Sequence, residues 1–382
     1  MQYRTFGQLD WKPSALGFGA MRLPTTDDDP KHINEPLATK MIHYAIDHGV
    51  NYVDTAWPYH QEASEPFLGR VLQGGYREKV RLATKSPCWL LEKPEDFDHY
   101  LGEQLKRLQT DHIDFYLLHA LNEERWQKML KLDIPAQAER AIADGRIRYL
   151  GFSFHDEYPV FKRILDDYDG WTFCQIQYNY MDVNYQAGTK GLKYAADKGL
   201  AVVIMEGLRG GQLAQNPPPD PVAEIWAESG RDRKPAEWGL QWLWNQPEVS
   251  VVLSGMSEMQ HVTENVASAD RSGVGTLTDE DLGLIERVRA TYEALAPIPC
   301  TGCGYCVPCP NGVDIPTLFR TYNEAMMYDD VEGARRTYNT WIKEEQRANM
   351  CVECGTCQEK CPQGLEIIEW LQKVHAELST AA

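Results

Sequence analysis

The sequence predicts an α/β protein, a (β/α)8 TIM barrel followed by a small helical domain. Short apolar runs alternate with amphipathic helical stretches from about residue 16 to residue 270. Eight of the ten cysteines lie beyond this repeat, between Cys300 and Cys361. Pro297 and Pro299 mark the junction, so we expect the barrel to span residues 1–296 and the helical domain residues 297–382.

The predicted strands are short apolar runs, and the predicted helices lie between them. The strands are expected at Leu16–Gly19, Tyr52–Asp54, Val80–Lys85, Ile113–His119, Ile147–Ser153, Phe173–Tyr178, Ala201–Met205 and Val249–Ser254. The helices include Leu37–His48, Pro94–Gln109, Ile134–Ala143, Gln186–Lys198, Ala236–Asn245 and Asp279–Leu295. Helices between buried strands imply right-handed crossovers and a parallel sheet, and eight such units are typical of a closed barrel. An open doubly wound sheet is the alternative, but the glycine-rich phosphate turn expected after its first strand is missing after Gly19.

The amino-acid composition and charge argue against some classes of function. The 382 residues contain 38 basic and 56 acidic side chains, a net charge of −18. This charge disfavours a nucleic acid or an anionic membrane surface as a partner. No apolar run is long enough for a membrane span, and the N-terminal residues lack the apolar core of a signal peptide. We therefore expect a soluble cytoplasmic protein.

Four polar side chains follow three consecutive strands of the predicted barrel. Asp54 ends the second strand, Tyr59 lies five residues later, Lys85 ends the third and His119 the fourth. Barrel enzymes place their chemistry at the carboxyl ends of strands. An ammonium lowers the pKa of a neighbouring phenol, a carboxylate keeps that ammonium charged, and a histidine can bond a carbonyl oxygen. Each residue alone has an ordinary structural explanation, but together they predict a proton donor placed over a polarised C=O group.

The cysteines of the tail form two runs. The first is Cys300, Cys303, Cys306 and Cys309, and the second is Cys351, Cys354, Cys357 and Cys361, each closed by Cys-Pro. In two-cluster ferredoxin runs the fourth cysteine binds the other cluster, so we assign Cys361 to the first triplet and Cys309 to the second, giving two [4Fe–4S] clusters. The first run has two residues before its last cysteine where three are typical. Zinc is the alternative, but zinc sites usually pair two CxxC knuckles.

Residues 313–348, between the two runs, are expected to form helices at Ile315–Met327 and Gly333–Arg347. The tail therefore resembles a helical two-cluster ferredoxin domain.

The barrel resembles the aldo-keto reductase family, and the whole chain resembles its iron–sulfur branch. The resemblance rests on Asp54-Thr55-Ala56…Tyr59, Lys85, Leu117-Leu118-His119, Gly151-Phe152-Ser153, Gln175-Ile176-Gln177-Tyr178-Asn179 and Glu264-Asn265. It implies NADP(H) bound across the rim of the barrel. It also implies that Tyr59 is the general acid, that Lys85 and Asp54 tune its pKa, and that His119 orients the substrate.

The resemblance also implies a set of cofactor-binding residues. They are Arg22, Ser153, Gln175, Met205, Leu208, Gly210, Ser254, Gly255, His261, Glu264 and Asn265. Ser153 and Gln175 match residues that hold the nicotinamide, whereas Met205 replaces an aromatic residue that often stacks on it. His261 stands where an arginine usually binds the 2′-phosphate, and Gly255 stands at a lysine position. These departures leave NAD(H) open beside NADP(H).

These features predict an oxidoreductase that interconverts a small carbonyl compound and an alcohol by hydride transfer. A hydride carries two electrons and a cubane normally one, so direct coupling requires a splitter such as a flavin, for which no motif is visible. Either the clusters transfer electrons to a ferredoxin or other redox protein, which we favour, or they are structural or oxygen-sensing. The alternative function is an electron-transfer subunit whose barrel docks a partner or senses a cofactor.

Overall fold

The structure is a computed structural model of the chain, and it describes residues 1–27, 29–300 and 302–380. The chain divides into two compact units. The first comprises residues 1–214 and 233–282, and the second comprises residues 215–232 and 283–382.

The first unit is a closed barrel of eight parallel strands in sequence order, which confirms the predicted fold. The strands are β1 (Leu16–Gly19), β2 (Tyr52–Asp54), β3 (Arg81–Ser86), β4 (Ile113–Leu121), β5 (Ile147–Phe154), β6 (Phe173–Gln177), β7 (Ala201–Met205) and β8 (Val249–Ser254). All eight predicted strands are present. β3 starts and ends one residue later than expected, β4 and β5 run further, and β6 ends one residue earlier.

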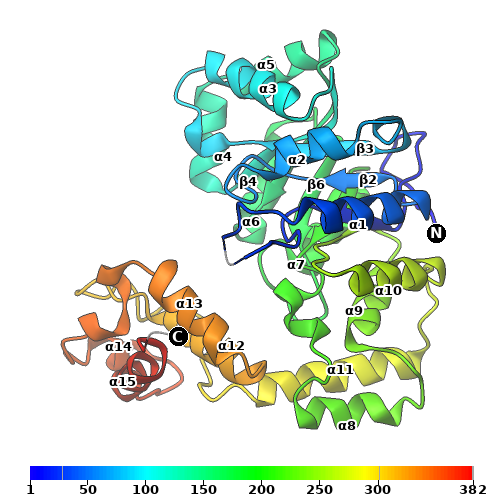
Figure 1. Cartoon of the computed structure of the whole chain (residues 1–382). Coiled ribbons are helices and arrows are strands. Elements are labelled where there is room, and N and C mark those ends of the chain that lie inside the picture. The colour runs from blue at the N-terminus through cyan, green and yellow to red at the C-terminus, as the bar shows by residue number, and fades with distance from the viewer. Residues whose placement is uncertain (28, 301, 381–382) are drawn as a thin grey trace. The chain divides into compact units, whose positions relative to one another are not determined.

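Helices follow the strands around the barrel, and Figure 1 shows them in blue to green. They are α1 (Glu35–Asp47), α2 (Ser64–Val71), α3 (Glu95–Arg107), α4 (Glu123–Lys131), α5 (Ile134–Ala143), α6 (Tyr158–Asp167), α7 (Gly188–Asp197), α9 (Pro235–Trp244) and α10 (Met259–Asp270). The ends of α1 and α4 are set locally by asparagine caps. The side chain of Asn34 accepts a hydrogen bond from Leu37 N, and that of Asn122 accepts one from Arg125 N. Each cap satisfies a backbone N–H that has no partner inside the helix.

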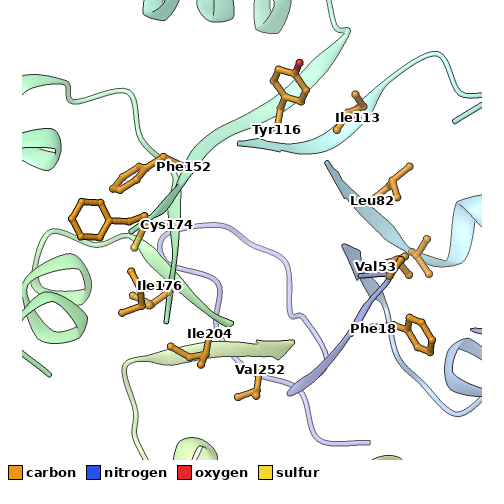
Figure 2. Packing of buried hydrophobic residues seen from close by; sticks show 14 of the residues in the cluster. Phe18, Val53, Leu82, Ile113, Tyr116, Phe152, Cys174, Ile176, Ile204 and Val252 are labelled. Atoms are coloured by element: carbon orange, nitrogen blue, oxygen red, sulfur yellow. The ribbon is translucent and has the colours of Figure 1, made fainter. Parts of the chain in front are cut away.

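Alternation along the strands divides the apolar residues into two cores. One set points outward and packs under the helices; it includes Val53, Leu82, Tyr116, Phe152 and Ile204, which Figure 2 labels. The other set fills the barrel interior: Tyr52, Ala83, Phe115, Leu117, Phe173, Ala201, Val203 and Val251. Because successive side chains of a strand point to opposite faces, every second residue after an interior one also faces inward.

The interior core is closed at one end by the N-terminal segment. Phe6 and Leu9 are joined by an antiparallel bridge, as are Tyr3 and Ser14. Phe6 is fully buried among the aromatic rings of the interior and lies 4.7 Å, centroid to centroid, from Phe115. Residues 3–14 therefore act as a plug, a role that the sequence analysis did not assign to them.

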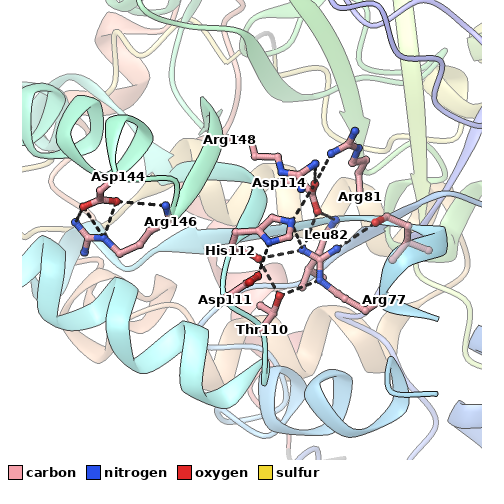
Figure 3. A network of polar contacts seen from close by, with 11 residues as sticks. Arg77, Arg81, Leu82, Thr110, Asp111, His112, Asp114, Asp144, Arg146 and Arg148 are labelled. Atoms are coloured by element: carbon pink, nitrogen blue, oxygen red, sulfur yellow. Dashed lines mark hydrogen bonds and ion pairs between the residues drawn. The ribbon is translucent and has the colours of Figure 1, made fainter. Parts of the chain in front are cut away.

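A buried carboxylate links three strands near their N-terminal ends (Figure 3). Asp114 on β4 forms ion pairs with Arg81 on β3 (2.7 Å), with Arg148 on β5 (3.3 Å) and with Arg77 (2.9 Å). It also accepts a hydrogen bond from Leu82 N at 3.0 Å. Polar contacts at this end of a barrel serve stability, since the chemistry of such folds lies at the other end.

The second unit is helical. It contains α8 (Asp220–Glu228), most of α11 (Asp279–Ala294), α12 (Ile315–Met327), α13 (Val331–Thr340), the short α14 (Thr356–Lys360) and α15 (Ile367–Leu378). Its own core is formed by side chains such as Leu318, Phe319, Tyr322, Tyr338 and Leu371. In Figure 1, α8 is green, α11 is yellow, and α12 to α15 run from orange to red.

One helix prediction in this unit is wrong in its extent. The expected helix at residues 333–347 corresponds to α13, which ends at Thr340. Arg347 explains the end, because its guanidinium donates to the carbonyl oxygens of Asn339 and Ile342 at 2.7 and 3.1 Å. A basic side chain that bonds the last carbonyls of a helix is a C-terminal cap.

Among the described residues, no helix is both long and apolar enough to cross a membrane.

Candidate active site and cysteine cavities

The four predicted catalytic residues meet at the carboxyl end of the barrel, and strand alternation explains why. Asp54 lies two residues after Tyr52, Lys85 two after Ala83, and His119 two after Leu117. Because these preceding residues belong to the interior core, the polar side chains face the barrel axis as well. The strand register places Asp54 beside Ala83 and Lys85 beside Leu117.

Lys85 is the centre of this arrangement. Its Nζ donates to both carboxylate oxygens of Asp54 at 2.7 and 2.8 Å and to the backbone oxygen of Thr55 at 2.7 Å. It also donates to the phenol oxygen of Tyr59 at 3.3 Å. Lys85 has no exposed surface and Asp54 is 2% exposed, so the ion pair is held out of water. The proposed chain of carboxylate, ammonium and phenol is therefore present as one connected network.

Burial sets the protonation of this network. It raises the pKa of Tyr59, and the ammonium of Lys85 offsets only part of that rise. We expected the phenol pKa to lie below its ordinary value, and the structure corrects this because desolvation outweighs the charge. Burial would lower the pKa of Lys85, but Asp54 and Tyr59 outweigh it and raise that pKa. Both Tyr59 and Lys85 thus hold their protons at neutral pH.

His119 lies across from the phenol. Its ring centroid is 6.2 Å from that of Tyr59 and 5.2 Å from that of Trp89. Burial, followed by the charges of Lys85 and two further basic residues, lowers the pKa of His119 well below its ordinary value. Nδ1 of this neutral imidazole is buried without a hydrogen-bond partner in the described part of the chain. The site therefore offers a phenol donor and a neutral imidazole to a ligand between them.

A layer behind Lys85 was missed by the sequence analysis. Gln104 on α3 donates to the backbone oxygen of Lys85 at 3.0 Å and to the carboxylate of Glu65 at 2.6 Å. Thr84 donates to the same Glu65 oxygen at 2.7 Å. Glu65 is fully buried, and burial raises its pKa. Acidic and amide residues on distant helices form this layer, so no local sequence signal identifies it.

Three predicted cofactor-binding residues lie on inward-facing positions of β5, β6 and β7. Gln175 follows Phe173 of the interior core by two residues, and its Nε2 lies 3.4 Å from the sulfur of Met205. Gln175 Oε1 is buried without a partner among the described atoms. Ser153 accepts a hydrogen bond from Ala120 N at 2.7 Å, so its own hydroxyl proton stays available. The hydroxyl of Ser153 can donate a hydrogen bond to the carbonyl oxygen of an amide, and Gln175 Oε1 can accept one from the N–H of the same amide.

Arg22, Gly210 and Gly255 also come together, from the loops after β1, β7 and β8. A Cβ atom added to Gly255 would lie 3.2 Å from the side chain of Arg22, and one added to Gly210 would lie 3.4 Å from its Nη2. Gly210 has a φ of +68°, which glycine adopts without strain. The guanidinium of Arg22 pairs with Glu206 at 3.3 Å, a partner that the sequence did not identify.

The remaining predicted cofactor residues differ in their exposure and in their contacts. Asn265 on α10 donates to Ser254 at 3.1 Å, and both are buried. His261 is exposed on the same helix, and Glu264 pairs with Lys234. A Cβ atom added to Gly239 of α9 would lie 2.8 Å from Leu208, so the side chain of Leu208 packs against that helix and only its backbone can serve a ligand.

The tail cysteines line two cavities in the combination expected from their spacing. One cavity is lined by Cys300, Cys303, Cys306 and Cys361, and the other by Cys309, Cys351, Cys354 and Cys357. The walls are otherwise largely apolar, and Ile315 borders both cavities. Four thiols around an apolar space fit the soft thiolate ligands of an iron–sulfur cubane. Among the described residues, no three His, Cys, Asp or Glu side chains are placed to hold a single metal ion.

Cys88 and Cys174, in contrast, are fully buried in the barrel unit. They belong to the apolar core that packs under the helices.

Comparison with known proteins agrees with this architecture. Residues 15–290 match the family model described as the aldo/keto reductase family, and residues 299–366 match the 4Fe-4S dicluster domain. The chain belongs to the aldo/keto reductase family and is an oxidoreductase with a C-terminal iron–sulfur domain.

Relatives and solved structures support the same family. The chain is 26% identical over 317 residues to L-galactose dehydrogenase of Arabidopsis thaliana, which covers 77% of this chain and 94% of the relative. It is 25% identical to the oxidoreductase YqkF of Bacillus subtilis, over 75% of this chain and 96% of the relative. The holo form of the aldo-keto reductase AKR11C1 from Bacillus halodurans superposes with a TM-score of 0.63 at 27% identity, covering 75% of this chain and 96% of that one.

Proposed function

We propose that the barrel interconverts a carbonyl compound and an alcohol with NAD(P)H, and that Tyr59 is the general acid and base. The observation that carries this proposal is the single ammonium of Lys85, which bonds both Asp54 and the phenol of Tyr59. Such an arrangement is useful where a phenol must give up a proton and then carry a negative charge. A bound nicotinamide would supply the hydride that reaches the carbonyl carbon.

The residues of the chain perform the remaining steps. His119, which is neutral, donates a ring N–H to the carbonyl oxygen and places that oxygen beside the phenol. As the C=O bond opens, Tyr59 Oη donates its proton to that oxygen. Lys85 stabilises the phenolate left behind, and Asp54 keeps Lys85 charged and oriented. In alcohol oxidation the phenolate takes the proton back.

The side chains of Gln175 and Ser153 support nicotinamide as the cofactor. The free acceptor of Gln175 and the free hydroxyl proton of Ser153 match the N–H and C=O groups of a carboxamide. Arg22 between Gly210 and Gly255 supplies a cation beside a flexible backbone turn, the chemistry that suits a pyrophosphate. The adenosine end of the cofactor would lie toward Ser254, Asn265, Glu264 and His261. A direct comparison of NADPH with NADH tests which of the two cofactors is preferred.

The test is turnover of the full chain, purified anaerobically, with NADPH or NADH and a set of aldehydes and ketones. We expect carbonyl-dependent oxidation of the reduced nicotinamide. Tyr59→Phe should lower kcat by about a hundredfold or more, the usual contribution of a positioned acid. Tyr44→Phe, on the outer helix α1, should be unaffected. A Tyr59→Phe variant with unchanged turnover would overturn the mechanism.

For the second unit we propose electron transfer through two [4Fe–4S] clusters, to or from a ferredoxin or a similar redox protein. The observation behind this proposal is that two four-cysteine cavities share the wall residue Ile315, and that Cys303 and Cys354 are exposed. Adjacent clusters with exposed ligands suit one-electron exchange with a partner. The test is the visible spectrum under anaerobic conditions. We expect dithionite to bleach it reversibly, and clusters that dithionite cannot reduce would favour a structural role.

A further inference from the structure

Arg125 is held beside the catalytic histidine. It lies in the first turn of α4, and its Nη1 donates to the backbone oxygen of Ala120, the residue after His119, at 2.6 Å. The guanidinium carbon lies 5.9 Å from the ring centroid of Trp89, and that ring lies 5.2 Å from His119. The guanidinium and the imidazole therefore both lie near the same aromatic ring.

The charge of Arg125 is not neutralised within the described part of the chain. No carboxylate there forms an ion pair with it, whereas Arg163 pairs with Glu123 and Arg107 with Glu62. In a protein with a net charge of −18, acidic partners are abundant. Arg125 is partly buried, and its one side-chain hydrogen bond uses one of five N–H donors. Among the described residues no other group bonds the donors that remain, so these can serve an anionic ligand.

The field of Arg125 reaches the reaction centre. Burial is the first cause of the lowered pKa of His119, and Lys85, His155 and Arg125 lower it further. The pKa of His155 is also lowered, mainly by burial and also by the charge of Arg125. Glu206, the acid that acts on both Tyr59 and His155, is itself paired with Arg22. An anion near the carbonyl group would thus enter a region of positive potential.

We infer that Arg125 binds a carboxylate of the substrate, and that the barrel acts on carbonyl compounds that carry such a group. A guanidinium presents parallel N–H donors that match the two oxygens of a carboxylate. Trp89 lies near both Arg125 and His119, so it can pack against the carbon skeleton that joins the carbonyl to the acid. This assignment rests on the proposed carbonyl chemistry of Tyr59 and His119, and it makes Arg125 a specificity-determining residue.

The kinetic test compares an acid with its neutral ester. The probes are 4-formylbenzoate and methyl 4-formylbenzoate, reduced by the full chain with NADPH under anaerobic conditions. We expect kcat/KM for the acid to exceed that for the ester by about tenfold, the gain of one charged contact. Arg125→Gln should raise KM for the acid about tenfold with little change in kcat, and it should leave the kcat/KM of the ester unchanged. Arg125→Lys should recover part of the lost kcat/KM for the acid.

A matched control removes an equal charge elsewhere. Arg140 is exposed on α5, so Arg140→Gln should leave both substrates unchanged. Equal kcat/KM for acid and ester in the unmodified protein would overturn the inference. So would an Arg125→Gln variant that slows both substrates alike, because that pattern indicates a structural role.

A binding measurement separates this inference from the proposed reaction. 4-Formylbenzoate is titrated calorimetrically into the unmodified chain, Arg125→Gln and Arg140→Gln, each with and without NADP⁺. Affinity that falls about tenfold in Arg125→Gln alone supports the carboxylate site even if no aldehyde is reduced. Equal affinity in the three proteins, or no binding to any of them, overturns it, whatever the outcome for Tyr59→Phe.

Discussion

The ammonium of Lys85 donates hydrogen bonds to both carboxylate oxygens of Asp54, at 2.7 and 2.8 Å, within the interior of the barrel. Neither side chain is accessible enough to be solvated if its partner is removed. The ion pair therefore has two roles. It holds the ammonium that bonds the phenol of Tyr59, and the stability of the fold depends on the presence of both charges.

Removing one member of this ion pair should lower the free energy of unfolding more than removing both members. Asp54→Asn leaves a buried ammonium without its counter-ion, and we expect the free energy of unfolding to fall by about 3–5 kcal/mol. The double variant Asp54→Asn/Lys85→Met removes both charges and should recover a large part of that loss. Urea unfolding of the two single variants and the double variant measures the coupling. Additive losses would show that the two charges do not depend on each other.

The pH dependence of reduction should follow the phenol. Since burial raises the pKa of Tyr59, the proton donor is intact through neutral pH, and reduction is lost only as pH rises through that raised pKa. His119, with its lowered pKa, stays neutral across the same range. Alcohol oxidation needs the phenolate and should increase as pH rises. Measurement of kcat in both directions from about pH 6 to about pH 10 tests this, and a reduction rate that falls between pH 6 and pH 8 would contradict it.

The ligand sets of the clusters predict which cysteine variants behave alike. Cys361→Ala and Cys300→Ala should each lose the first cluster, whereas Cys309→Ala and Cys357→Ala should each lose the second. Iron should fall from about eight to about four atoms per chain in each case.

Electron paramagnetic resonance of the reduced proteins then shows which cluster remains. Cys174→Ala, in the barrel core, should retain the full iron content. If Cys309→Ala and Cys300→Ala gave the same residual signal, the crossed assignment would be wrong.

The arginine network around Asp114 should support stability without serving catalysis. Asp114→Asn removes the charge that three guanidinium groups share, and these groups are partly exposed, so we expect a loss of about 2–3 kcal/mol. KM and kcat should stay within about twofold, because this end of the barrel is opposite the catalytic rim. Asp111→Asn, on an exposed neighbour, is the matched control. A selective loss of kcat in Asp114→Asn would contradict this separation.

The barrel and the inward-facing positions of three proposed catalytic residues could be predicted because both depend on local periodicity. Eight apolar runs identified the strands, and alternation within β2, β3 and β4 fixed the inward direction of Asp54, Lys85 and His119. The spacing of each cysteine triplet likewise indicates three of the side chains around each cavity, and the two-cluster ferredoxin pattern supplies the fourth, Cys361 or Cys309, from the other run.

Other features depend on contacts between distant segments and could not be predicted in this way. Glu206 meets Arg22 across 184 positions of the chain, and Gln104 reaches Glu65 across 39. The end of α13 depends on Arg347, which lies beyond the helix and bonds back to it. The net pKa of Tyr59 depends on burial by the whole fold, so the neighbouring ammonium alone predicted the wrong direction.

The central claim is that Tyr59 protonates a carbonyl oxygen while a nicotinamide hydride reaches the carbonyl carbon. It is tested most directly by reduction of 4-formylbenzoate with NADPH that carries deuterium at both C4 positions, using the full chain and Tyr59→Phe under anaerobic conditions. The account predicts one deuterium on the carbinol carbon of the alcohol and a rate about a hundredfold or more lower in Tyr59→Phe. Product without deuterium, or an equal rate in the two proteins, would contradict it.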